Sequence, residues 1–146
     1  MKRIFLLTVS LLLIGVGIVR ADKDYVITKS ELPVKAREFV DKYFAKSKIS
    51  YVKEERDFFE RNYEVFFADG SKVEFFRNGE WREVDCRYTE VPAVIVPSAI
   101  LNYVREHFAG ERILKIERER SDYDVKISNK LELTFDKNFK IKEIDD

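Results

Sequence analysis

The hydrophobic positions of the chain first follow a helical spacing and then alternate, and this succession occurs twice. One set recurs at three- and four-residue intervals: Ala36, Phe39, Val40, Tyr43 and Phe44. A second set has the same spacing: Ile100, Tyr103, Val104, His107 and Phe108. Such spacing is typical of a helix with one apolar side. Pro33 and Pro97 precede the two sets, and proline is tolerated in a first helical turn. We therefore predict two helices that face a core.

Short runs with period-two alternation, rich in aromatic and β-branched residues, follow each predicted helix. They are residues 49–55, 63–68, 72–77 and 81–85, then 113–119, 123–128, 131–135 and 139–144. Asp69-Gly70 and Asn78-Gly79 separate strands of the first group as hairpin dipeptides. The second group has Lys130 and Phe139 in place of these glycines, which weakens the hairpin prediction there. Connections this short predict antiparallel neighbours.

An internal repeat underlies the two series of elements. An offset of 64 aligns residues 32–57 with 96–121, and seven of the 26 pairs are identical. An offset of 60 aligns residues 63–85 with 123–145, with six of 23 pairs identical. Average residue usage gives roughly one or two matches over such a length. We therefore predict two α–ββββ units, about 32–85 and 96–145, and four extra residues in the first unit before Tyr63.

The predicted fold is α+β, a tandem repeat with one antiparallel sheet of up to eight strands and both helices on one of its faces. Alternation places Val65 on the helix-covered face and Phe66 on the other. On this second face the units differ, since Phe66 and Phe76 correspond to Lys126 and Asp136. We therefore expect the first unit to present an aromatic sheet face.

The first 21 residues are predicted to be a secretory signal peptide. Lys2 and Arg3 form a positively charged start, and residues 4–19 hold no charged side chain. Residues 19–21 then supply small or compact side chains at the positions that a signal peptidase reads. An uncleaved anchor is the alternative, but the apolar run is shorter than the about 20 residues that span a bilayer. We expect cleavage before Asp22, leaving one exported domain, 22–146, without a stable membrane span.

Composition and charge exclude several classes of protein. The chain has 146 residues, of which 45% are hydrophobic, and this supplies enough apolar area for one ordinary core. Its 27 basic side chains balance 27 acidic ones. No basic stripe is interleaved with aromatic residues, so we do not expect a nucleic-acid partner. A single cysteine excludes a disulfide scaffold.

The combined motifs resemble a known family. They are Leu32-Pro33, a helix ending at Phe44, Tyr63-Glu64-Val65, Asp69-Gly70, Val73-Glu74-Phe75, Asn78-Gly79-Glu80-Trp81 and Val84-Asp85, with weaker counterparts in the second unit. Over about residues 25–146 the chain is similar to the PepSY-like family of small periplasmic proteins from Gram-negative bacteria. The resemblance implies a fold similar to the tandem-repeat fold of β-lactamase inhibitory protein and a periplasmic or secreted location. It says little about a ligand.

Candidate catalytic residues are few. His107, the only histidine, lies on the apolar side of the second predicted helix, so we expect it to be substantially buried beside the sheet rather than a base or metal ligand. Cys86, the only cysteine, is linked to it by no motif. A free, partly shielded thiol is expected there, and an intermolecular disulfide stays open in an oxidising compartment. With no metal-binding or phosphate-binding spacing either, we expect no enzyme, no metal and no cofactor.

Aromatic residues are unevenly divided between the units, and this points to binding. Of 20, 13 lie in residues 32–88 and five in 96–145. The surplus that we single out as a candidate binding set is Phe58, Phe59, Phe66, Phe76, Trp81 and Tyr88. Phe66 and Phe76 are expected to be cross-strand neighbours. An external partner, self-association, and burial by residues 22–29 all remain open as reasons for the surplus.

The sequence therefore predicts an exported, non-enzymatic module that binds a protein, peptide or envelope component through the aromatic sheet face of the first unit. One alternative is an inhibitor of a peptidase or hydrolase, which the resemblance suggests. The other is a structural subunit of the cell envelope without a discrete ligand.

The repeat makes a prediction about backbone geometry. The Cα traces of residues 33–57 and 97–121 should superpose as a helix followed by a strand, with Tyr63 and Tyr123 at matching strand positions. An experimental structure with parallel strands, or with either segment entirely helical, would refute the repeat.

Overall fold

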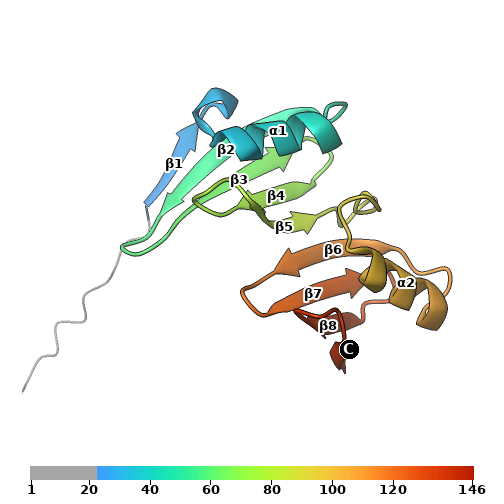
Figure 1. Ribbon diagram of the computed structural model, residues 1–146. Coiled ribbons are helices and arrows are strands. Elements are labelled where there is room, and N and C mark those ends of the chain that lie inside the picture. Colours follow the sequence, from blue (N-terminus) through green and yellow to red (C-terminus); the bar gives the residue numbers. More distant parts are fainter. Residues whose placement is uncertain (1–22) are drawn as a thin grey trace, which may run out of the picture.

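The sheet and the two helices form two layers in the computed structural model, which describes residues 23–146. Nine strands make one antiparallel sheet, in which each strand pairs with the next along the chain. Both helices lie on the same face of this sheet (Figure 1). The predicted signal peptide lies outside the described residues.

The elements follow the order that the hydrophobic pattern predicts, with one addition at the start. Before the first helix come β1 (Lys23–Ile27) and the 3-10 turn η1 (Lys29–Glu31). The next five elements are α1 (Val34–Tyr43), β2 (Ile49–Arg56), β3 (Arg61–Phe67), β4 (Lys72–Phe75) and β5 (Trp81–Asp85). The last five are α2 (Ser98–His107), β6 (Ile113–Arg118), β7 (Asp122–Ile127), β8 (Glu132–Asp136) and β9 (Ile141–Asp145).

Strand β1 corrects the expectation of at most eight strands. It pairs antiparallel with β2 along the edge of the sheet, with Tyr25 opposite Glu54 and Val26 opposite Lys53. The hydrogen-bonding groups of an edge strand are a ready template for a further strand. The N-terminal segment therefore extends the sheet in its own plane. It does not cover Phe66, so burial by residues 22–29 does not explain the surplus of aromatic residues.

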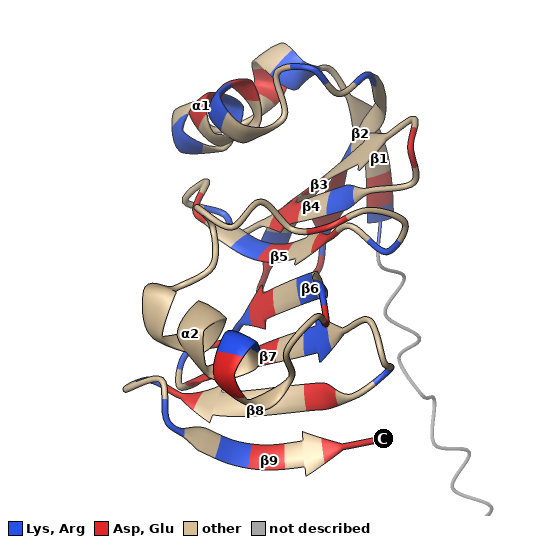
Figure 2. Ribbon diagram, turned by 90° about the vertical axis from the view of Figure 1, so that its right-hand side faces the viewer, with Lys and Arg blue, Asp and Glu red and all other residues tan. Residues whose placement is uncertain are grey.

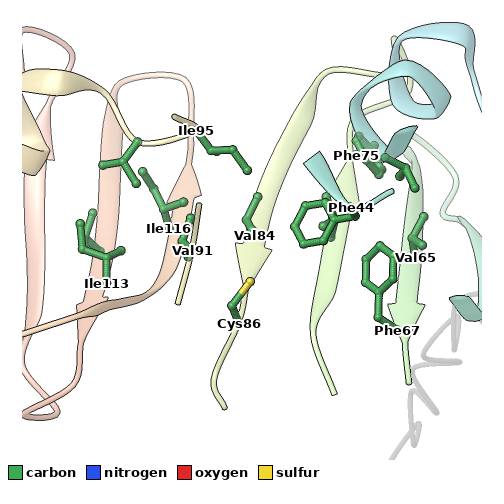
Figure 3. Close-up of a cluster of buried hydrophobic side chains, with 14 of the residues drawn as sticks. Phe44, Val65, Phe67, Phe75, Val84, Cys86, Val91, Ile95, Ile113 and Ile116 are labelled. Carbon is green, nitrogen blue, oxygen red and sulfur yellow. The ribbon is translucent and has the colours of Figure 1, made fainter. Parts of the chain in front are cut away.

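The core lies between the helices and the covered sheet face. Ala36 and Val40 of α1, like Ile100 and Val104 of α2, are buried. Of the ten side chains that alternation assigns to the covered face, Tyr123 is half-buried. The other nine are buried: Tyr63, Val65, Phe67, Val73, Phe75, Val125, Ile127, Leu133 and Phe135. Figure 3 shows how the cluster continues across the middle of the sheet, where Val91 and Ile95 of the segment after β5 join Val84 and Ile116.

Each helix also places one aromatic ring edge-on against a strand residue. Phe39 meets Phe75 with ring centroids 5.5 Å apart, and Tyr103 meets Phe135 at 5.3 Å. These four rings occupy aligned positions of the two predicted units. Burial of a ring of this size contributes on the order of 2–3 kcal/mol, so the helices are fixed to the sheet mainly by apolar contact.

Left-handed backbone occurs in hairpins of both halves. Gly70 and Gly79 have φ of +87° and +85°, as the hairpin dipeptides predict. Lys130 and Phe139 adopt φ of 78° and 63° without being glycine, so the second half forms the predicted hairpins even without the glycines of the first. The left-handed conformation costs roughly 1–2 kcal/mol in such a residue, and Phe139 offsets this cost by packing on Tyr123 at 5.3 Å.

Gly79 and Gly110 offer a matched test of how closely α1 approaches the sheet. Both have φ of +85°, but a Cβ at Gly79 would lie 2.9 Å from Pro33 Cβ, whereas nothing lies within 4 Å of one at Gly110. Both alanine substitutions carry the left-handed strain, and only Gly79→Ala also forces the start of α1 outward. We expect Gly79→Ala to lower the free energy of unfolding by about 1–3 kcal/mol more than Gly110→Ala, measured by urea denaturation. Equal losses of unfolding free energy in the two variants would mean that the start of α1 moves outward without a measurable cost.

Candidate binding surface

The sheet face opposite the helices is lined mainly by charged side chains. In register across β3 to β7 stand five acidic residues: Glu64, Glu74, Glu83, Glu117 and Asp124. Figure 2 shows the acidic and basic bands on these strands. Like charges directly opposite one another on a sheet are destabilising. This acidic row therefore requires cations close by.

Lysines supply those cations: Lys53 stands in the same row, opposite Glu64, and Lys72 and Lys115 stand in the adjoining row. Lys53 Nζ lies 2.9 Å from Glu64 Oε2, and Lys72 and Lys115 lie 3.2 and 3.0 Å from the two oxygens of Glu83. Glu64 and Glu83 are only 8% and 7% exposed, although they face away from the core. The face is thus a largely self-neutralised ion-pair network. This corrects the expectation of an aromatic sheet face.

Glu117 is the acidic residue of this row whose titration is most perturbed. Burial, a hydrogen bond with Glu119 and the negative charge of Glu83 raise the pKa of Glu117 to about 7. Arg82 lies 2.9 Å from Glu119 Oε1 and 3.9 Å from Glu117 Oε1. The arginine therefore favours the charged form of Glu119 first, and it lowers the pKa of that carboxyl.

The two phenylalanines predicted for the open face do not lie together. Phe66 stacks on Tyr51 with centroids 4.4 Å apart and stands opposite Lys72. Phe76 lies four residues beyond Lys72, roughly 13 Å along the strand direction, where its ring lies 5.8 Å from the guanidinium of Arg82. The expectation that Phe66 and Phe76 are neighbours is wrong, because the register of β3 with β4 puts them at opposite ends of the charged band.

Two other members of the predicted binding set are also placed elsewhere. Trp81 stands opposite buried Phe75 and packs against the core. The guanidinium of Arg118 covers its ring at 4.2 Å. Tyr88 is 73% exposed in the segment after β5, beside the turn at Gly70. Neither lines a pocket together with Phe58 or Phe59.

Phe58 and Phe59 form the tip of the β2–β3 hairpin. They are 80% and 74% exposed, and their rings meet edge-to-face at 4.8 Å. The hairpin is closed by a hydrogen bond that the Asp57 N–H donates to the Glu60 carbonyl at 2.9 Å. Its strands are tied together at Glu54, which pairs with Arg56 and Arg61 at 2.8 and 3.0 Å. The two rings are therefore carried on a braced hairpin.

A groove of about 420 Å³ opens beside this hairpin. In a sheet whose strands pair in chain order, alternate turns lie at the same end, so the β2–β3, β4–β5 and β6–β7 turns meet here. The groove is lined by Phe59, Glu60, Arg61, Asn62, Phe76, Arg77, Asn78, Arg82, Glu119 and Arg120. We call it the turn groove, and we call the groove together with Phe58 the hairpin-end surface.

The structure thus brings together three of the six predicted residues, Phe58, Phe59 and Phe76, and separates the others. Sequence reasoning missed the arginines of the groove, of which Arg77 and Arg120 belong to turns 43 residues apart in the chain. Both follow the last residues of strands that end at one edge of the layer. That signal becomes visible only once the strand order is known.

Neither candidate catalytic residue, Cys86 or His107, lines the turn groove. Cys86 is 2% exposed, and burial raises the pKa of its thiol. It is more shielded than expected, and an intermolecular disulfide requires local opening. His107 is exposed, which corrects the expected burial: it ends α2, stacks on Tyr103 at 4.1 Å and lies with Nδ1 3.1 Å from the Tyr103 carbonyl oxygen.

Within residues 23–146 no three histidine, cysteine, aspartate or glutamate side chains are grouped so that they could hold a metal ion. Neither described helix is long and apolar enough to cross a bilayer.

Glu117 predicts a pH dependence of stability. Its pKa is about 7 in the folded chain against an ordinary value of 4.5, so the folded state holds the proton more tightly. The resulting stabilisation is complete below pH 4.5 and is lost as the pH rises through 7. Glu117→Gln stays neutral and should gain on the order of 1 kcal/mol relative to wild type between pH 5 and pH 8, measured by denaturation at each pH. Glu106→Gln, exposed on α2, is the control. Parallel profiles for wild type and Glu117→Gln would contradict the assignment.

Comparison with known proteins identifies the family. The sequence profile described as "Putative beta-lactamase-inhibitor-like, PepSY-like" matches residues 61–143. A crystal structure from Bacteroides thetaiotaomicron, titled a "putative calcium-regulated periplasmic protein", is 44% identical, with a TM-score of 0.83 over 84% of this chain and 97% of that one. No protein with a curated description matches the chain.

Two structures from Bacteroides vulgatus are similar as well. One, a periplasmic protein, is 41% identical, with a TM-score of 0.84 over 86% of this chain and 99% of that one. The other, a periplasmic protein "of unknown function", is 38% identical, with a TM-score of 0.81 over 85% and 100%. These relatives confirm the periplasmic location expected from the sequence. The chain belongs to the PepSY-like family.

Proposed function

We propose that this protein is a non-enzymatic binding module of the periplasm that holds a protein or peptide partner at its hairpin-end surface. The observation that carries the proposal is the exposure of Phe58 and Phe59, at 80% and 74%, on a hairpin that also borders a groove. Exposed rings of this size leave about 1.5–3 kcal/mol of burial free energy each to be gained. A partner that covers the two rings makes this burial free energy part of the binding free energy.

The bracing of the hairpin favours binding. Glu54 holds both Arg56 and Arg61 at ion-pair distance while being only 5% exposed itself. A pre-ordered surface loses less conformational entropy when a partner binds. Aromatic rings add apolar area with few rotatable bonds, as at energetic centres of interfaces.

The arrangement of titratable groups supports a non-enzymatic role. Cys86 is buried with a raised pKa, which disfavours the thiolate that a nucleophile requires. His107 is engaged with Tyr103 at the end of α2. On the open face, Glu64 and Glu83 are held by lysines at 2.9 to 3.2 Å, an arrangement that suits stability of the sheet.

The proposal includes the tandem repeat. The α–ββββ order occurs twice, and the aligned pairs Phe39–Phe75 and Tyr103–Phe135 make the same edge-on contact. On this view the two halves share a core, and the longer β2–β3 turn with its two phenylalanines is the specialised part of the first unit. Inhibition of an envelope peptidase or hydrolase is the form that this function takes when the partner is an enzyme, in keeping with the family description.

A site-specific photo-crosslinker tests the binding surface. Benzoylphenylalanine at position 58, introduced into the exported protein in cells, should give one defined crosslinked species with a second protein. The same group at Val94, which is 76% exposed in the segment before α2, is the control and should not give that species. Phe58→Ser/Phe59→Ser should then weaken binding of the purified partner by at least about tenfold, while Val94→Ser leaves it unchanged.

Other outcomes of this experiment contradict the proposal. A crosslink of twice the chain mass identifies self-association, and equal crosslinking at both positions indicates unspecific contact. If Phe58→Ser/Phe59→Ser abolishes the cooperative unfolding transition, the two rings belong to the folding core and not to a binding surface.

A further inference from the structure

Arginines gather around the turn groove. Six of the ten arginines in residues 23–146 lie in or next to the three turns that meet there: Arg56, Arg61, Arg77, Arg82, Arg118 and Arg120. The lysines of the neighbouring sheet face, by contrast, neutralise its acidic row. Arginine presents a planar fork of donors that matches a carboxylate with two parallel hydrogen bonds, whereas lysine acts as a point charge.

Four of these arginines are engaged within the protein. Glu54 pairs with Arg56 and Arg61. Arg82 lies 3.0 Å from Glu74 and 2.9 Å from Glu119, and Arg118 covers Trp81. These contacts fix the walls of the groove.

Arg77 and Arg120 are different. Both are exposed and both line the turn groove, and in the part of the chain that the structure describes neither makes an ion pair with a carboxylate. They come from the β4–β5 and β6–β7 turns, so two different hairpins contribute them to the groove. Phe76 lies between the charged band and these turns and supplies an apolar surface next to them.

We propose that the turn groove binds an acidic peptide segment, with a carboxylate held by Arg77 and Arg120 and a neighbouring apolar side chain packed against Phe59 and Phe76. This inference rests on the proposed function and names the chemistry of the partner. The charge balance of the groove supports it, because four arginines face only two glutamates, Glu60 and Glu119. Complementary charge raises the rate of encounter and selects among partners.

The shape of the surface favours a peptide over an anionic membrane. Membrane-surface sites rely on lysine and arginine spread over a flat or helical surface. Here the arginines line a concave groove together with Glu60 and Glu119, and two aromatic rings belong to the same lining. Such a site suits one or two carboxylates beside a ring or aliphatic side chain.

Calorimetric titration of the purified protein with synthetic peptides tests this inference. The probe is an N-acetylated, C-amidated hexapeptide with alternating aspartate and phenylalanine, and the comparison peptide has asparagine in place of aspartate. We expect the aspartate peptide to bind at least about tenfold more tightly in about 50 mM salt, with the difference shrinking in about 500 mM salt. Arg77→Gln/Arg120→Gln should erase this preference. Lys46→Gln/Arg105→Gln removes the same charge from exposed positions outside the groove and should keep it.

The outcomes separate this inference from the proposed function. Equal affinity for both peptides, or a preference that survives Arg77→Gln/Arg120→Gln, overturns the acidic specificity; weakening of both peptides by Phe58→Ser/Phe59→Ser then still supports a binding surface. Binding of neither peptide also overturns the inference. A third result would overturn it too: the protein binds vesicles rich in anionic phospholipid but neither peptide, and Arg77→Gln/Arg120→Gln loses the vesicle binding. The site would then recognise a lipid headgroup.

Discussion

The pairing of β5 with β6 is the contact on which the rest of the structure depends. It consists of three residue pairs, with Val84 opposite Ile116 at its centre. Because these two strands pair, the two halves form one sheet in chain order and the β6–β7 turn lies beside the β4–β5 turn. The ion pair of Arg82 with Glu119 crosses the same junction. Without this pairing there would be two half-sheets and no groove between their turns.

Much of the fold follows from local pattern, whereas the site depends on register. Alternation identified the covered face, since the burial of Val65 or Phe135 needs only the side-chain period of a strand and a helix to pack on. The side-chain period also places Phe66 and Phe76 on one face. The distance between them, however, depends on the strand register, in which Phe66 stands opposite Lys72. Composition does not encode this register. The predicted burial of His107 was wrong because this residue, the last of its helix, stacks on Tyr103 in the preceding turn. Strand β1 was missed because five residues pairing at an edge leave almost no hydrophobic signature.

The distribution of charge explains why recognition is assigned to the end of the sheet and not to its face. On the face, four of the five carboxylates of the acidic row lie within 4 Å of a lysine or arginine nitrogen, and Asp124 accepts a hydrogen bond from Thr134. A ligand there would have to replace contacts that already exist. At the turns, the backbone changes direction and side chains from three hairpins project around a hollow. A rigid scaffold that carries variable turns is a common arrangement for binding proteins.

The position of Cys86 links the folding of the chain to the compartment in which it folds. Its backbone N–H donates to the Leu114 carbonyl at 2.7 Å, next to the β5–β6 pairing, and the Val91 N–H donates to Ile113 nearby. Ser71 and Thr89 lie beside its thiol, so the thiol is enclosed once the segment after β5 packs against the sheet. An oxidant of the periplasm can reach it before that packing and not afterwards. The oxidation state of Cys86 therefore depends on which happens first, the packing of this segment or an encounter with an oxidant.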